Sequence, residues 1–273
     1  MADVDSRVAL IQRLSGRLHA FLAGLSQDQW SRPSACDLWE VRDVVGHLTG
    51  GAGRQIESMR RGLNGDSAPP PGFEPMDAAT LSATNARRDR ALRERLGEQL
   101  LATFAARYGE LGELLDEYGS HGWETPCWHA RRGVMTGADY ADLRIQELAI
   151  HDWGIRSAFH AEATLDPESV APLLDIASAW LQMTFRPGPR LDAPLVYRFD
   201  LMGPAGLLLD VTVAGDDFQI APAGGFLADA VVRCDADSYL LYLYGRFIAS
   251  AGRLAVEGEP FLMRRFEEWF KGL

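Results

Sequence analysis

Long stretches of apolar residues at helical spacing fill the first 160 residues, and this pattern constrains the fold more than any other. Further stretches of the same kind cover about 38–63, 77–118 with a break near Gly97, and 138–159. Long helices that each carry an apolar stripe most readily bury these stripes by packing against one another. We therefore predict an N-terminal four-helix bundle. The first stretch repeats every three or four residues, at Val8, Ile11, Leu14, Leu18, Phe21, Leu22 and Leu25.

Two segments interrupt the helical pattern. Residues 64–75 are rich in Gly and Pro, which predicts a loop. Residues 120–137 carry several aromatic side chains without helical spacing, and we expect an irregular segment there.

After about residue 161 the pattern changes to short runs of β-branched and aromatic residues flanked by Gly or Pro. Such runs are typical of strands. With the helices expected among them, they indicate an α+β domain. We therefore predict an α+β fold in two domains, residues 1–162 and 163–273. The expected strands are 195–199, 206–213, 218–220, 230–234 and 253–256, and the expected helices are 167–184, 235–244 and 259–270.

Composition excludes several classes of protein. Hydrophobic residues make up 47% of the 273, enough for a full core without disulfides. A net charge of -11 disfavours nucleic acids and anionic membranes as partners. The N-terminal residues lack the apolar core of a signal peptide, and no apolar run approaches the roughly 18 residues that span a bilayer. We expect a cytoplasmic protein whose three cysteines, Cys36, Cys127 and Cys234, are reduced thiols.

One group of residues indicates chemistry. Glu147 and His151 lie four residues apart in a helical segment, so they share one helix face. His47 lies in another helical segment, next to the aliphatic Val44 and Val45. If His47 faces the other two, they form a two-histidine, one-carboxylate metal site with an open position, which suits catalytic zinc or non-haem iron. The alternative is a core histidine and an ordinary helix-surface pair.

Other residues could complete such a site. Arg144 and Asp152 flank the pair on the same helix and are candidates for outer partners that orient a ligand. His129, in the aromatic segment, is a candidate for an additional ligand.

Two motifs that contain these residues resemble a known family. Residues 30–47 resemble the Trp…Pro…Trp-x-Val-x-Asp-Val-x-x-His signature of the mycothiol-dependent maleylpyruvate isomerase family, and residues 144–152 resemble its second signature. Asn85 stands where members often carry Asn at the start of the third helix. The family belongs to the DinB-like superfamily of metal-binding four-helix bundles. The resemblance implies that His47, Glu147 and His151 are metal ligands.

The C-terminal half resembles the same family in outline. Residues 242–246 and 254–258 are similar to the ending of its sterol-carrier-protein-like domain. The resemblance makes Arg246 the first candidate for a catalytic contact with a carboxylate-bearing substrate, and Arg233 the second.

The function that the resemblance implies is thiol chemistry at a metal. The metal would be divalent, with zinc expected and iron or nickel as alternatives, and mycothiol would be the cosubstrate. The deprotonated thiol would attack a small electrophile, giving isomerisation or S-transfer. Two alternatives stay open: an oxygen-dependent non-haem iron enzyme, and a non-catalytic metal-stabilised protein that binds a small ligand, with Cys127 or His129 as a fourth metal ligand. A monomer and a homodimer are both compatible with the sequence.

Overall fold

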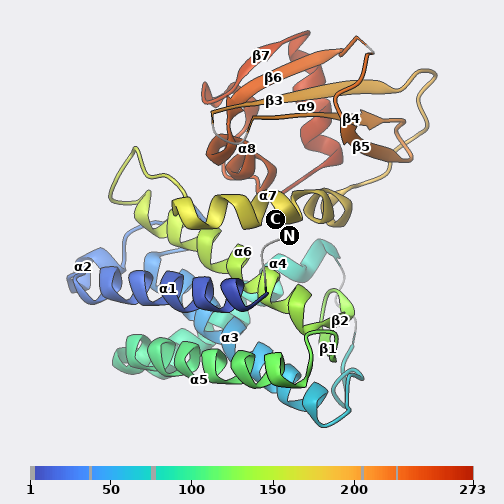
Figure 1. Cartoon of the computed structure of the whole chain (residues 1–273). Helices are drawn as coiled ribbons and strands as arrows, with labels where there is room; N and C mark the ends of the chain where they lie inside the picture. Colours follow the sequence, from blue (N-terminus) through green and yellow to red (C-terminus); the bar gives the residue numbers. More distant parts are fainter. Residues whose placement is uncertain (1–3, 37–38, 75–77, 204–205, 226, 273) are drawn as a thin grey trace. The chain divides into compact units, whose positions relative to one another are not determined.

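The computed structural model describes residues 4–36, 39–74, 78–203, 206–225 and 227–272. It divides into two compact units, which meet in the chain between Ser169 and Val170. The first unit is mainly helical and the second contains a sheet, which confirms the predicted α+β class (Figure 1). That residues 1–162 form a metal-binding domain and residues 163–273 a sterol-carrier-protein-like domain stays a prediction.

The helices of the first unit follow the apolar patterns of the sequence. The expected helix over 77–118 is interrupted at Gly97, which adopts a positive φ of 52° and opens a short 3₁₀ turn. The elements are α1 Val4–Ala23, α2 Gln27–Trp30, α3 Val41–Leu63, α4 Ala78–Leu96, η1 Gly97–Gln99, α5 Leu100–His121, β1 Pro126–His129, β2 Gly133–Thr136 and α6 Gly137–Arg156.

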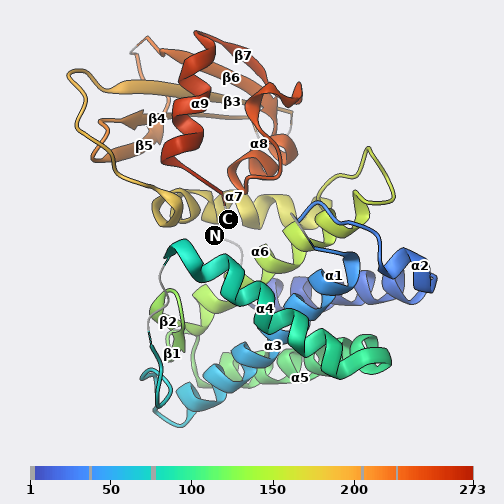
Figure 2. The same cartoon turned by 180° about the vertical axis from the view of Figure 1, so that it is seen from behind.

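Helices α1, α3, α5 and α6 enclose one hydrophobic core. Each contributes fully buried side chains, among them Ile11, Leu48, Phe104, Leu111 and Leu148. Helix α4 packs on α3, and the two views of the chain show it beside that helix (Figures 1 and 2). The apolar stripes therefore determine which helix faces are buried.

The sequence suggested that the segment 120–137 is irregular, but part of it is regular. It contains an antiparallel hairpin in which β1 pairs with β2, with Cys127 opposite Met135 and Trp128 opposite Val134. Each strand has only four residues, too few for an alternating pattern to stand out. The hairpin packs on α3.

The Arg-rich helix α4 is joined to α3 by partly buried ion pairs. Arg93 lies 3.1 Å from the carboxylate of Asp43 on α3, and Arg54 on α3 lies 3.1 Å from Asp89 on α4. The Asp89 side chain is only 1% exposed. Each helix therefore supplies an arginine to an aspartate of the other, and these ion pairs hold α4 against α3.

Within the described residues, the second unit contains a five-stranded sheet with the strand order β5-β4-β3-β6-β7. Strands β3 and β6 are parallel, and the other neighbouring pairs are antiparallel. The expected helix over 167–184 is confirmed as α7. The elements are α7 Pro167–Thr184, β3 Leu195–Met202, β4 Leu207–Val213, β5 Phe218–Pro222, β6 Ala230–Asp235, α8 Ala236–Leu243, η2 Ala249–Ala251, β7 Ala255–Glu257 and α9 Pro260–Trp269.

Helix α9 covers one face of this sheet (Figure 2). The ring of Phe266 lies 5.0 Å from that of Tyr197 and 5.3 Å from that of Phe199, alternate residues of β3. The residue between them, Arg198, points to the other face and forms two 2.8 Å hydrogen bonds with Asp210 on β4. The period-two alternation of β3 thus separates the core from a charged face.

The Arg198–Asp210 pair gives a prediction for stability. Hydrogen bonds from Arg198 lower the pKa of Asp210 against the opposing effect of burial. A lowered pKa stabilises the fold above the unfolded value of about 3.9, and the contribution is lost as the pH falls through the folded value. We expect Asp210→Asn to reduce the free energy of unfolding by about 2 kcal/mol at pH 7.

Urea denaturation at neutral and acidic pH tests this prediction. The difference between wild type and Asp210→Asn should shrink at acidic pH, while the exposed Asp192→Asn serves as control. A difference that is constant with pH would contradict the role given to the ionised carboxylate.

None of the helices in the described part of the chain is long and apolar enough to cross a membrane.

Candidate metal centre

Helix α3 carries His47 in its second turn. The helix begins with a reciprocal capping arrangement, in which the Glu40 amide donates to Asp43 at 3.1 Å. One turn after Asp43, His47 lies between buried aliphatic residues, with its side chain 16% exposed. The imidazole therefore enters an apolar wall and needs polar partners there.

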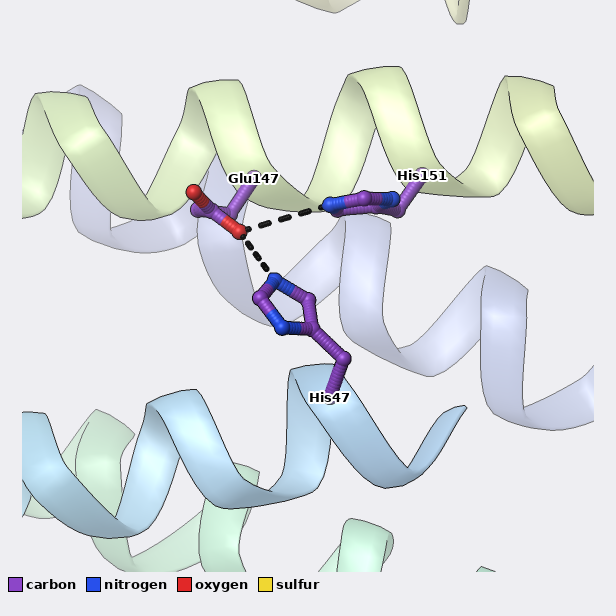
Figure 3. Close-up of side chains that lie close together, drawn as sticks. All are labelled: His47, Glu147 and His151. Carbon is purple, nitrogen blue, oxygen red and sulfur yellow. Dashed lines mark hydrogen bonds and ion pairs between the residues drawn. The ribbon is translucent and has the colours of Figure 1, made fainter. Parts of the chain in front are cut away.

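Helix α6 supplies one of those partners, Glu147, and carries His151 beside it. Glu147 and His151 project from one face of α6 toward His47 (Figure 3). Oε2 of Glu147 lies 2.9 Å from Nε2 of His47 and 3.5 Å from Nε2 of His151. One ligand atom from each residue lies within 4.8 Å of the others. The structure brings together the three residues that the sequence singled out.

Each histidine has a second contact on its other nitrogen. Nδ1 of His47 lies 2.8 Å from Oδ2 of Asp89 on α4. Nδ1 of His151 lies 3.4 Å from the sulfur of Cys36, which precedes α3. Both Nδ1 atoms are therefore engaged outward, and both Nε2 atoms face Glu147.

The electrostatics of the group favour a charged carboxylate. Burial opposes the ionisation of Glu147, but hydrogen bonds from His151 and His47 outweigh it and hold the pKa of Glu147 well below its usual value. Burial also opposes the charged form of His151, but Cys36 and Glu147 raise the pKa of that imidazole to about 9. At Asp89 burial is outweighed by hydrogen bonds from His47 and Arg88, and the pKa is lowered.

The aromatic ring of Trp39 covers both histidines. Its centroid lies 5.2 Å from the ring of His47 and 6.4 Å from that of His151, with the latter pair parallel to within 10°. Apolar cover of this kind keeps water away from one side of the group.

Comparison with known proteins identifies the family of this unit. The model of the mycothiol maleylpyruvate isomerase N-terminal domain matches residues 11–156. The chain belongs to this family. The match includes His47, Glu147 and His151, and it confirms the resemblance seen in the sequence motifs.

Solved structures show the same fold over nearly the whole chain. A crystal structure of the mycothiol-dependent maleylpyruvate isomerase aligns with a TM-score of 0.65 and 16% identity, covering 94% of each chain. A histidine-to-alanine mutant of that isomerase aligns with a TM-score of 0.64, the same identity and the same coverage. No curated protein sequence matches the chain.

The two outer partners expected on α6 bind other groups. Asp152 accepts hydrogen bonds from Arg156 at 2.8 and 2.9 Å. Arg144, in the family's second signature, donates to Gln55 at 2.8 Å and to Tyr108 at 3.4 Å. That Asp152 and Arg144 orient a ligand stays a prediction, and the outer nitrogens of the two histidines contact Asp89 and Cys36.

The proposed fourth ligands lie in the hairpin. Nδ1 of His129 accepts the backbone amides of Arg131 and Arg132, and burial lowers the pKa of His129 to about 4. The sulfur of Cys127 lies 3.5 Å from the Met135 carbonyl oxygen, and burial raises the pKa of this thiol to about 11. Within the described ranges, the cluster of metal-ligating side chains contains only the three residues on α3 and α6.

The two arginines predicted to meet a substrate lie in the second unit. Arg246 follows α8 and is partly buried. Arg233 on β6 pairs with Glu257 on β7 and lies 3.4 Å from Asp200 on β3. These pairs give Arg233 a structural role on the sheet, whereas Arg246 stays a candidate for the substrate. Asn85 lies on α4, four residues before Asp89.

Proposed function

We propose that this protein is a metal-dependent enzyme that uses mycothiol, or a related low-molecular-weight thiol, to act on a small electrophile. The reaction we favour is isomerisation of the maleylpyruvate type, and S-transfer is the alternative. The observation that carries the proposal is the convergence of His47, Glu147 and His151 in a unit that belongs to the mycothiol maleylpyruvate isomerase family.

The donor set fits a divalent metal. Two Nε2 atoms and one carboxylate oxygen face one another, which is the ligand set of many catalytic zinc sites. Three protein ligands leave a coordination position for a substrate, whereas structural zinc has four. Bound zinc would supply Lewis acidity, which lowers the pKa of a thiol enough to give a thiolate at neutral pH.

The residues of the chain have distinct tasks in this scheme. Glu147 provides a negative charge that offsets part of the charge of a dication. Asp89 and Cys36 engage the outer nitrogens of the two histidines and so limit the rotation of the rings. Trp39 shields the site on one side.

The proposed isomerisation consists of an addition and an elimination, and it needs no oxidant or reductant. For a cis-enoyl dicarboxylate, the sulfur of the deprotonated thiol forms a bond to one alkene carbon, and the alkene electron pair moves toward the adjacent carbonyl group. Rotation about the resulting single bond follows. The electron pair then returns, the carbon–sulfur bond breaks, and the trans product and the thiolate are released. The protein contributes activation and orientation.

Cobalt substitution tests the proposal directly. Titration of the cobalt-loaded protein with mycothiol should change its visible spectrum as sulfur enters the coordination sphere, and maleylpyruvate should then be converted. An unchanged spectrum would contradict thiol binding at the metal. Purification with stoichiometric iron, together with oxygen-dependent turnover, would support the non-haem iron alternative instead.

Arg246 gives a separate prediction about the substrate. If its guanidinium binds a substrate carboxylate, Arg246→Ala should lower kcat/KM by about 100-fold, the loss of a charge-assisted hydrogen bond of about 2–3 kcal/mol. Metal content should not change. Arg264→Ala on the exposed face of α9 is the matched control. Wild-type kcat/KM in Arg246→Ala would remove this residue from the proposal.

A further inference from the structure

We propose that Asp89 is the positioning residue for His47, and that the close packing of α4 on α3 serves to deliver this carboxylate. The inference rests on the proposed metal site and adds to it a residue that the sequence did not indicate. Asp89 would hold the imidazole by Nδ1 so that Nε2 faces the metal.

The contacts of Asp89 hold its carboxylate in one orientation. Oδ2 lies 2.8 Å from Nδ1 of His47 and accepts a hydrogen bond from Arg88 at 3.2 Å. Oδ1 accepts from Arg54 at 3.1 Å and from Arg88 at 2.9 Å. With the side chain 1% exposed, both oxygens are engaged inside the α3–α4 interface.

Two glycines on α3 permit this approach. A Cβ on Gly46 would lie 2.9 Å from Cβ of Arg93 and 3.1 Å from the carbonyl oxygen of Asp89. A Cβ on Gly50 would lie 3.1 Å from Leu92 and 3.2 Å from Oδ1 of Asp89. The glycines are four residues apart and share one helix face, so α4 can approach the backbone of α3 closely at these two positions.

A purely structural ion pair would not require the contact with His47. Asp43 already joins α3 to α4 through Arg93 at 3.1 Å and Arg90 at 3.6 Å. Asp89 differs because one of its oxygens lies against a ring nitrogen of a metal-ligating residue. A carboxylate that accepts the Nδ1 hydrogen leaves the Nε2 lone pair for the metal and makes it more basic.

Metal affinity without turnover is the decisive measurement. We expect Asp89→Asn, which keeps the size and removes the charge, to weaken cobalt binding by about 10- to 100-fold, the range typical of outer-shell changes. Asp43→Asn is the matched control, because it removes the other buried carboxylate of the α3–α4 interface. It should weaken cobalt binding much less than Asp89→Asn does, because the contact between Asp89 and His47 is kept. Competition with a chelator gives the dissociation constants, and thermal unfolding without metal gives the cost to the fold.

A second variant moves the helix and keeps every charge. Gly46→Ala should push α4 away from α3 and weaken cobalt binding in the same direction as Asp89→Asn. It also carries the test if Asp89→Asn does not fold. Wild-type affinity in either folded variant, or an equal loss in Asp43→Asn, would overturn the positioning role. A wild-type protein that binds no cobalt would instead refute the proposed function itself.

Discussion

Replacing Glu147 by Gln is expected to abolish metal binding while leaving the helical unit folded. Gln has the same size but lacks the negative charge that faces both imidazoles, and its amide is a weaker ligand for zinc. We expect cobalt affinity to fall by more than about 100-fold, beyond the 10- to 100-fold range of outer-shell changes. Turnover with mycothiol should fall to background. Chelator competition and circular dichroism would measure the two effects separately.

The matched control for this variant lies on the same helix. Asp152 is also an acid on α6, but its carboxylate binds Arg156. Asp152→Asn should therefore keep both the metal and the activity. Stoichiometric metal in Glu147→Gln would show that α6 supplies a different ligand, and metal loss in Asp152→Asn would return that residue to the site.

Helical spacing is sufficient to predict two of the three residues of the candidate site. Glu147 and His151 share a helix face at a separation of four residues, whatever surrounds them. His47 lies 100 residues from Glu147, so helical spacing could not show that it joins the pair, and the family motif supported that hypothesis. The motif and the spacing together indicated all three residues.

The outer contacts could not be read in the same way. Asp89 stands among arginines, where an acid is normally part of a solvated charge pattern. Its approach to His47 depends on Gly46 and Gly50, whose effect appears only when two helices pack in a particular register. Cys36 lies before α3, outside any regular pattern that relates it to His151.

In the second unit, too, the sequence predicted local elements but not how they pair. Short runs of β-branched and aromatic residues indicated each strand of this unit. They did not indicate that β3 and β6 lie side by side in parallel, since strand order depends on long-range pairing. The hairpin of the first unit was missed because its two strands are too short to show alternation.

Gly62 is a position inside a helix where even the smallest added side chain should cost much stability. It lies near the end of α3, and a Cβ there would be 2.4 Å from the carbonyl oxygen of Pro126 and 2.5 Å from the hydroxyl of Tyr118. Neither neighbour can move easily, because Pro126 is in β1 and Tyr118 is fully buried. We expect Gly62→Ala to reduce the free energy of unfolding by about 3 kcal/mol, at the upper end of overpacking effects.

Gly109→Ala is a matched variant that should change the free energy of unfolding in the opposite direction. Gly109 is also inside a helix, α5, but is exposed, and a Cβ there would meet nothing within 4 Å. Alanine lowers the conformational entropy of the unfolded chain, so this variant should stabilise the protein by about 0.5–1 kcal/mol. Urea denaturation of the two variants in parallel separates helix propensity from packing. If Gly62→Ala were also stabilising, then the hairpin could shift at little cost, and the packing of β1 on α3 would not constrain the end of that helix.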